Sequence, residues 1–341
     1  MYLDHNATSP MGPDVQRAVC AAMNNAWANP SSPHRQGQAA SVMVEKSRRI
    51  IAERMGVPPK AVFFTSGATE GNAWVLSGRR CPVVASAIEH PSVLAWADET
   101  IPVDADGVID LGQLDARLSR GEALVSVMAA NNETGVLQPI AAIEALCTKH
   151  GARFHCDATQ CFGRLNRPVA ADFVTVSAHK LGGPRGVGAL IGAAPSKPLL
   201  LGGKQERGQR AGTLNVPGIV GFGAAVEANA DWSGVEREKL EAFCVSRGGR
   251  VIGVGTDRLP NTLSVVFDTP GDVLVPILDL AGISASTGSA CASGASQGSH
   301  VLAAMGIEGT PVRFSFGPGA KARPAIDALG RALDQADVAC V

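Results

Sequence analysis

Short apolar runs alternate with helix-like stretches through the middle of this 341-residue chain, from about residue 60 to residue 192. The runs lie at 62–64, 83–85, 124–128, 153–156 and 173–176. Parallel strands need long crossover connections, which helices usually supply, and a sheet covered by helices buries its strands. The pattern therefore predicts an α/β fold with a mostly parallel sheet and helices on both faces.

A second, smaller unit is expected after this block. Further helices are predicted at three places, 36–55, 140–150 and 325–338. The glycine-rich segment 202–208 interrupts regular structure, and a strand is expected at 263–267. We expect a large domain over 12–233 and a small α+β domain made of 1–11 and 234–341.

Polar side chains follow four of the predicted strands. They occupy 66–70, 131–133, Asp157 and 177–180. In an open α/β sheet the reactive groups gather in the crevice at the carboxyl ends of the strands. The four strand ends therefore predict one shared site.

The charge balance gives little support for a polyanionic partner. Thirty basic and thirty-one acidic residues leave a net charge of -1, so we expect neither nucleic acid nor a membrane surface as a partner. No apolar stretch reaches the roughly 18 residues of a membrane span, and no basic region with an apolar run opens the chain. The expected compartment is the cytoplasm.

The eight cysteines show no C-x-x-C pair and no dense disulfide pattern, so reduced thiols are expected. His155, Cys156 and Cys161 form the nearest metal-like group, but their spacing fits no zinc pattern, and buried thiols are the alternative. No metal is expected.

The residues after two of the predicted strands suggest binding sites for a phosphate group and for a cationic ring. Gly67 and the helix predicted to open at 68–70 could receive a phosphate on free N–H groups, although a simple helix cap fits the same letters. Asp157, with Gln160 three residues later, could be a metal ligand, a cap or the partner of a cationic ring nitrogen.

Three further side chains have both a chemical and an ordinary interpretation. Lys180 ends an apolar strand, where desolvation would lower its pKa and suit Schiff-base chemistry; a surface charge is the alternative. Cys291 lies among small residues in a segment over about 286–300, predicted to be a mobile loop with an accessible thiol, reactive or without consequence. Arg313 could grip a substrate carboxylate or form an ordinary ion pair.

Together these segments resemble the NifS/IscS-like cysteine desulfurases, a class V group of aminotransferase-fold, pyridoxal phosphate fold type I enzymes. The resemblance runs nearly end to end. Its segments are 2–10 (YLDHNATSP), 64–70 (FTSGATE), 89–90 (EH), 131–135 (NNETG), 155–160 (HCDATQ), 177–180 (SAHK), 210–213 (RAGT) and 288–291 (GSAC). The chain departs from the family pattern at Leu201, Lys204 and Pro318.

The resemblance implies a pyridoxal 5'-phosphate site with distinct roles for its residues. Lys180 would carry the cofactor as a Schiff base, while His90 would stack on the pyridine ring and move protons. Asp157 would pair with the ring nitrogen and Gln160 with the ring hydroxyl oxygen. The implied phosphate ligands are Ala68, Thr69, Ser177, His179 and, from the second subunit of a homodimer, Thr213.

The implied reaction removes sulfur from L-cysteine, leaving L-alanine and a persulfide on Cys291. Asn132 and Arg313 would orient the substrate carboxylate. The segment around Cys291 resembles that of the long-loop subgroup, which implies an acceptor protein in iron–sulfur cluster assembly or thiolation.

Three alternatives stay open at this point. A related C–S lyase or selenocysteine lyase would need no persulfide on Cys291. A catalytically silent partner could bind the cofactor without turnover. A nicotinamide-dependent oxidoreductase has the weakest support, because no G-x-G-x-x-G follows the first strands.

Overall fold

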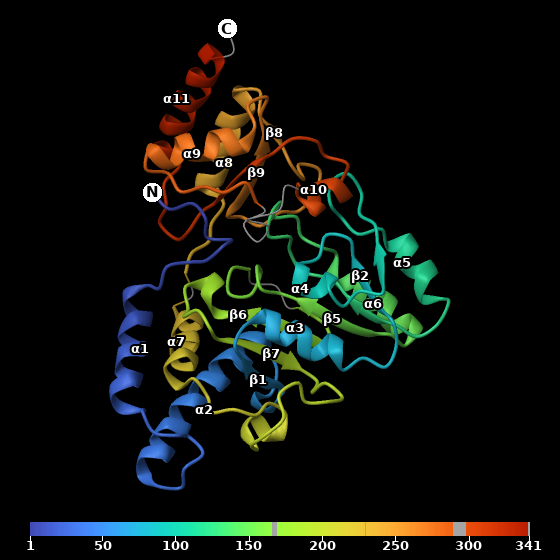
Figure 1. The fold of residues 1–341 in the computed structure, drawn as a ribbon, viewed down its shortest axis with the longest axis vertical. Coiled ribbons are helices and arrows are strands. Elements are labelled where there is room, and N and C mark those ends of the chain that lie inside the picture. The colour runs from blue at the N-terminus through green and yellow to red at the C-terminus, as the bar shows by residue number, and fades with distance from the viewer. Residues whose placement is uncertain (166–168, 229, 289–297, 340–341) are drawn as a thin grey trace.

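A seven-stranded sheet forms the middle of the computed structural model, which describes residues 1–165, 169–228, 230–288 and 298–339 (Figure 1). In order across the sheet the strands are β1 (Val62–Thr65), β7 (Gly188–Gly192), β6 (Phe173–Ser177), β5 (Arg153–Asp157), β4 (Leu124–Ser126), β2 (Val83–Ser86) and β3 (Glu99–Ile101). The four pairings from β6 to β3 are parallel, and only β7 runs against its neighbours. The predicted α/β class and mostly parallel sheet are confirmed.

All five predicted strands of this region are present, with changed ends. β4 stops at Ser126, two residues earlier than expected, and the strands β3 and β7 were not among the predicted runs. β7 has glycine at both ends, which shortened its apolar signal. Gly188 permits a close approach, because a side chain there would lie 2.7 Å from the Cα atom of Gly67.

Helices cover both faces of this sheet. They are α1 (Pro13–Asn25), α2 (Arg35–Met55), α3 (Ala68–Ser77), α4 (Pro91–Leu94), α5 (Leu111–Leu118), α6 (Ile140–His150) and α7 (Val216–Glu227), with short 3₁₀ turns η1 (Pro59–Ala61), η2 (Ala178–Leu181) and η3 (Gln205–Gly208). Successive strand residues point to opposite faces. Phe64 and Val176 therefore join the core under α2 and α7, whereas Phe63 and Leu190 pack with Trp74 of α3.

A second unit lies above the large sheet in Figure 1. Its antiparallel sheet has the order β10 (Val312–Ser315), β9 (Thr262–Val266) and β8 (Arg250–Val251). Its helices are α8 (Val235–Ser246), α9 (Gly271–Leu280), α10 (His300–Ala304) and α11 (Arg323–Ala339). Leu263, Phe314 and Leu329 belong to a buried apolar cluster separate from the core of the large sheet.

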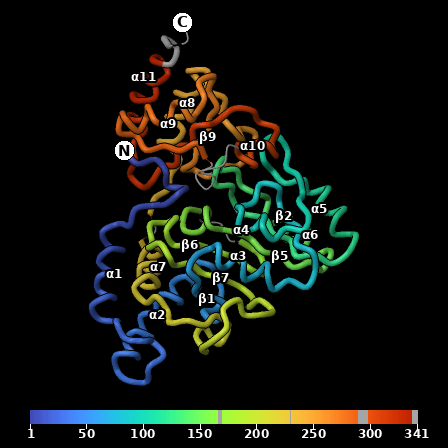
Figure 2. Tube along the Cα trace, in the orientation of Figure 1, coloured from blue at the N-terminus to red at the C-terminus, as the bar shows by residue number. Residues whose placement is uncertain are grey.

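The N-terminal segment connects the two units. Leu3 is buried in the apolar cluster of the second unit, where its carbonyl accepts a hydrogen bond from Ser315 N (2.7 Å). From there the chain runs down to α1 beside the large sheet (Figure 2). The expected boundaries at 11/12 and 233/234 stay predictions. Among the described residues, no helix has the length and apolarity that a membrane span requires.

Candidate active site

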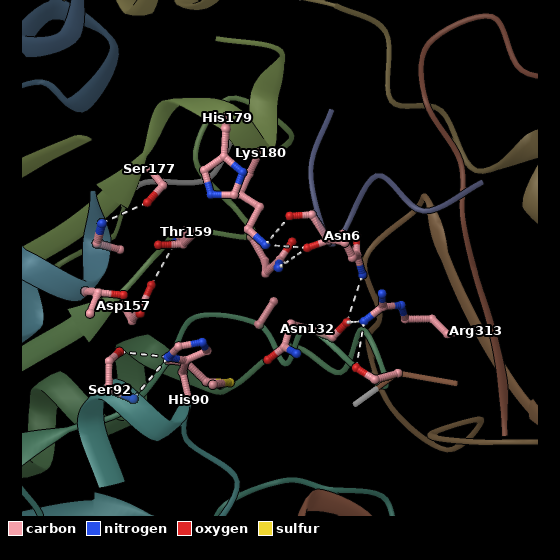
Figure 3. Close-up of a pocket in the computed structure, with 17 residues that line it drawn as sticks. Asn6, His90, Ser92, Asn132, Asp157, Thr159, Ser177, His179, Lys180 and Arg313 are labelled. Carbon is pink, nitrogen blue, oxygen red and sulfur yellow. Dashed lines mark hydrogen bonds between the residues drawn. The ribbon is translucent and has the colours of Figure 1, made fainter. Parts of the chain in front are cut away.

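One cavity of about 270 Å³ lies where the carboxyl ends of β4, β5 and β6 meet the N-terminal segment and β10 (Figure 3). Ten of the twelve residues proposed from the sequence line it: Ala68, Thr69, His90, Asn132, Asp157, Gln160, Ser177, His179, Lys180 and Arg313. The strand ends meet because β1, β4, β5 and β6 all point to the same edge. The shared site expected there is present as a cavity, whereas the roles of its residues stay predictions.

One end of the cavity suits a phosphate. The helix α3 begins at Ala68, and the first N–H groups of a helix have no acceptor within the helix. Ser177 Oγ accepts a hydrogen bond from Ala68 N (2.8 Å), which holds the end of β6 against this helix start. Burial, assisted by nearby cations such as Lys180, lowers the pKa of His179 to about 4, so its ring is neutral at pH 7.

A carboxylate occupies the middle of the cavity. Asp157 ends β5 and is 7% exposed. Its Oδ2 accepts a hydrogen bond from Asn72 Nδ2 (2.9 Å), and its Oδ1 accepts one from Thr159 N (3.0 Å). The two donors fix the orientation of the carboxylate, which suits a partner for a protonated ring nitrogen.

His90 lies beside this carboxylate, just before α4. Its Nδ1 accepts a hydrogen bond from Ser92 N (3.1 Å) and lies 2.7 Å from Ser92 Oγ. Burial lowers the pKa of His90, despite the opposing effect of Asp157. The ring is therefore neutral at pH 7 and can both give and take a proton.

Lys180 reaches the cavity from η2, directly after β6. Its Nζ donates hydrogen bonds to Ala7 O (2.9 Å) and to Asn6 O, both in the N-terminal segment. Gln160 Nε2 donates to the same Asn6 carbonyl (3.0 Å). The lysine is half-buried. It directly follows the end of β6, as the sequence predicted.

Arg313 lies at the opposite end of the cavity, on β10, and is 1% exposed. Its guanidinium forms an ion pair with Asp4 (2.5 Å) and donates 3.0 Å hydrogen bonds to the carbonyls of Asn132 and Gly288. Its Nε is buried and has no hydrogen-bond partner among the described residues. The ion pair and the position at the cavity, given as alternatives from the sequence, therefore occur together.

Two proposed residues do not join the cavity. Thr213 lines a different hollow, beside Met23 and the exposed Trp27, so a role for it in this cavity needs a second subunit. Cys291 and most of the predicted loop lie outside the described residues. None of the described cysteines lines the cavity, and burial raises the pKa of Cys147 and Cys244 to about 12, which makes them poor nucleophiles.

Several residues that line the cavity had no predicted role. Examples are Asn6, Ala7, Ser92, Thr159 and Gly288. Asn6 and Ala7 lie in one of the resembling segments, which was the available signal, but their contact with Lys180 joins positions more than 170 residues apart. The departures at Leu201, Lys204 and Pro318 do not line the cavity.

The residues present fit pyridoxal 5'-phosphate. The cavity contains a lysine amine for the aldehyde of the cofactor and a carboxylate, which accepts two hydrogen bonds, for its ring nitrogen. It also contains a neutral imidazole for the face of the ring and a helix start for the phosphate. At the far end, Arg313 supplies a guanidinium that suits a substrate carboxylate. Within the described residues, no cluster of histidine, cysteine or acidic groups could hold a metal ion.

Comparison with known proteins agrees with this geometry. The Aminotransferase class-V family matches residues 1–324. A cysteine desulfurase of Cereibacter sphaeroides is 41% identical over 93% of this chain and 90% of its own. A solved NifS-like protein superposes with a TM-score of 0.90 at 32% identity, covering 99% of both chains. The structure of SspA in complex with cysteine superposes with a TM-score of 0.82 at 29% identity, covering 93% of this chain and 99% of the other. The chain belongs to the class-V aminotransferase family, in its group of NifS-like cysteine desulfurases.

Proposed function

We propose that this chain is a cysteine desulfurase, which uses pyridoxal 5'-phosphate to remove sulfur from L-cysteine and leaves L-alanine. The observation that carries the proposal is one cavity in which Lys180 and Asp157 share the space with the buried guanidinium of Arg313. The names of the relatives and the cysteine-bound SspA structure support cysteine as the substrate.

The cofactor would be held at four places. Lys180 would bond its aldehyde carbon, Asp157 would face its ring nitrogen, Gln160 its ring hydroxyl, and the start of α3 its phosphate with Ser177 and His179. When bound, it supplies an aromatic electron acceptor that weakens the bonds at the α-carbon of the substrate. The ionised Asp157 keeps that acceptor effective, because a nearby negative charge holds the ring nitrogen protonated.

Arg313 and Asn132 would orient the substrate. The carboxylate of cysteine would meet the guanidinium of Arg313, which Asp4 holds in place through the ion pair. This grip turns the α-carbon of the substrate toward Lys180, whose amine accepts the α-proton. His90, neutral at pH 7, would pass a proton between the substrate and the amine.

Cys291 would take the sulfur. Its thiolate forms a bond with the substrate sulfur while the bond between that sulfur and Cβ breaks, and the carbon skeleton gains the protons that convert it to alanine. The sum of the reaction is cysteine and a thiol giving alanine and a persulfide, so no outside oxidant or reductant is needed. This residue lies outside the described part of the chain.

The proposal also includes the oligomeric state, the sulfur acceptor and the location of the protein. A homodimer would bring Thr213 to the phosphate of the neighbouring subunit. An acceptor protein in iron–sulfur cluster assembly or thiolation would take the persulfide sulfur, in the cytoplasm.

A single-turnover experiment tests the proposal. The purified protein loaded with pyridoxal 5'-phosphate is mixed with L-cysteine without reductant, and alanine and labelled thiols are measured by mass spectrometry. We expect equal amounts of alanine and of persulfide on Cys291, and no alanine from Lys180→Ala. Alanine formation in Cys291→Ala at the wild-type rate, with free sulfide released, would favour a C–S lyase instead.

A further inference from the structure

A row of polar side chains lies beneath Asp157, on the face of the sheet that α3 covers. Ser126 of β4 pairs with His155 of β5, and Asp157 pairs with Thr175 of β6. All of these strand residues point toward α3, because their immediate neighbours Val125, Phe154, Cys156, Val174 and Val176 belong to the core on the other face. Ser126, His155 and Thr175 are completely buried.

The helix α3 comes close enough to join this row. A side chain at Gly71 would lie 2.7 Å from the Cγ2 atom of Thr175, so only glycine permits this spacing without a shift. Asn72, the next residue, is completely buried and contacts three side chains. Its Nδ2 donates to Asp157 Oδ2 (2.9 Å) and to Ser92 Oγ (3.0 Å), while its Oδ1 accepts from Thr175 Oγ1 (2.5 Å).

The direction of every hydrogen bond in this row follows from the carboxylate. Asp157 accepts only, so the amide nitrogen of Asn72 must face it and the amide oxygen must face Thr175. The hydroxyl of Thr175 spends its single proton on that oxygen, so it accepts from His155 Nε2–H (3.2 Å). His155 Nδ1 then accepts from the hydroxyl of Ser126 (2.8 Å).

The second branch of the network reaches His90. Because Ser92 Oγ accepts from Asn72, its own proton is available for His90 Nδ1, 2.7 Å away. The backbone N–H of Ser92 also points to that nitrogen. Two donors on Nδ1 leave the ring proton of the neutral imidazole on Nε2.

We infer that Asn72 is a positioning residue that couples the two sides of the cofactor site: it orients the carboxylate of Asp157 and, through Ser92, fixes the neutral Nε2–H form of His90. The inference rests on the proposed function for its meaning in turnover. The amide itself does not line the cavity, so its effect is transmitted through these two neighbours.

The inference predicts how His90 titrates when the amide is lost. Burial is the main cause that lowers the pKa of His90; among the charged and titratable groups that act on the ring, Asp157 raises this pKa, and Lys180 and His300 lower it. In Asn72→Leu, the hydroxyl of Ser92 is no longer held with its proton on Nδ1, so the neutral ring loses a donor that favours it. Protonation of His90 then becomes easier, so its pKa rises.

The test measures His90 directly. Nitrogen chemical shifts of labelled histidine are followed against pH in the full chain, with and without pyridoxal 5'-phosphate. We expect Asn72→Leu to raise the pKa of His90 by on the order of one unit, and the acid limb of the turnover pH profile to move by the same amount. An unchanged titration with the Nδ1–H form present in wild type would overturn the inference.

Further variants at Ser92 and Thr175 test the two branches of the hydrogen-bond network separately. Ser92→Ala should raise the pKa of His90 as Asn72→Leu does, and the double variant should show no additional rise. Thr175→Val removes the donor to the amide oxygen while Asp157 still orients the amide nitrogen, so it should raise the pKa of His90 less than Asn72→Leu does, and Thr175→Ser should restore the wild-type value. Additive effects of Asn72→Leu and Ser92→Ala would contradict the proposed route.

The histidine titration also separates this inference from the proposed function. If the chain failed to make alanine from cysteine while His90 still responded to Asn72, the network would stand and the reaction would be wrong. If alanine formed normally and His90 ignored the change at Asn72, the reaction would stand and the network would be wrong.

Discussion

The two sides of the cavity are built on different principles. The floor, formed by β4, β5, β6 and α3, connects the carboxylate of Asp157 to neutral side chains whose hydrogen bonds run in a fixed order. The opposite wall, formed by the N-terminal segment and β10, contacts two buried guanidinium groups: Arg313, which lines the cavity, and Arg164, which does not. Arg313 pairs with Asp4, whereas Arg164 contacts only carbonyl and amide oxygens among the described residues and stacks over the ring of Trp232 at 4.6 Å.

This difference sets what each side tolerates. Removing a partner from a buried charge is expensive, since the charge stays behind without compensation, whereas a neutral hydrogen bond has a small net effect. The floor should therefore tune protonation at little cost in stability. The wall should control both substrate binding and folding.

The strongest test of the wall removes its cavity-facing cation. Arg313→Leu should lower kcat/KM for cysteine by about 100- to 1,000-fold, because a buried charge pair with the substrate carboxylate is lost. Steady-state kinetics with cysteine measure this loss. Arg313→Lys serves as the matched control and should recover part of it, since an ammonium keeps the charge but not the fork. A wild-type KM in Arg313→Leu would place the substrate carboxylate elsewhere.

The next test keeps the cation and removes its partner. Asp4→Asn leaves Arg313 buried without its counter-charge and should lower the free energy of unfolding by about 3 kcal/mol. Asp327→Asn, in the exposed pair with Arg323, is the control and should change stability little. Urea unfolding compares the two variants. Equal, small losses would mean that the buried pair behaves like a surface pair.

The second guanidinium should matter through its hydrogen bonds. Arg164 donates to Asn6 Oδ1, Gln160 Oε1 and the backbone oxygens of His5 and Lys180. Arg164→Met should cost about 2 kcal/mol of stability, because these buried acceptors lose their donor while the charge is removed as well. Thermal unfolding measures this loss of stability, with Arg164→Lys as the control variant that keeps the positive charge. A more stable Met variant would show that the desolvation penalty of this guanidinium exceeds the stabilisation from its hydrogen bonds.

The smallest effect belongs to the floor and depends on pH. Burial lowers the pKa of His155 to about 4, below the value of about 6.5 in an unfolded chain. As pH falls below 6.5, the unfolded chain binds a proton that the folded chain does not, so stability falls. Between pH 6 and pH 5 this histidine should remove about 1 kcal/mol, with no effect above pH 7. His155→Gln should flatten the slope of stability against pH in this window. An unchanged slope would contradict the assignment.

Local sequence patterns were enough to predict which side chains follow the strands of the large sheet. Asp157 and the segment 177–180 follow apolar runs, and parallel strands must present their carboxyl ends along one edge. For that reason the mostly parallel sheet, and the gathering of these residues in one cavity, could be predicted from local patterns. The roles assigned to them remain to be tested.

The tertiary structure alone decided the contacts between distant parts of the chain. The pairing of Asp4 with Arg313 spans 309 positions, and Asn72 meets Asp157 across 85, so no local pattern contains either contact. The strand β7 was missed because its glycines, needed for close packing against β1 and β6, weaken an apolar signal. The local sequence determines which residues follow a strand, but only packing decides which side chains of distant segments touch.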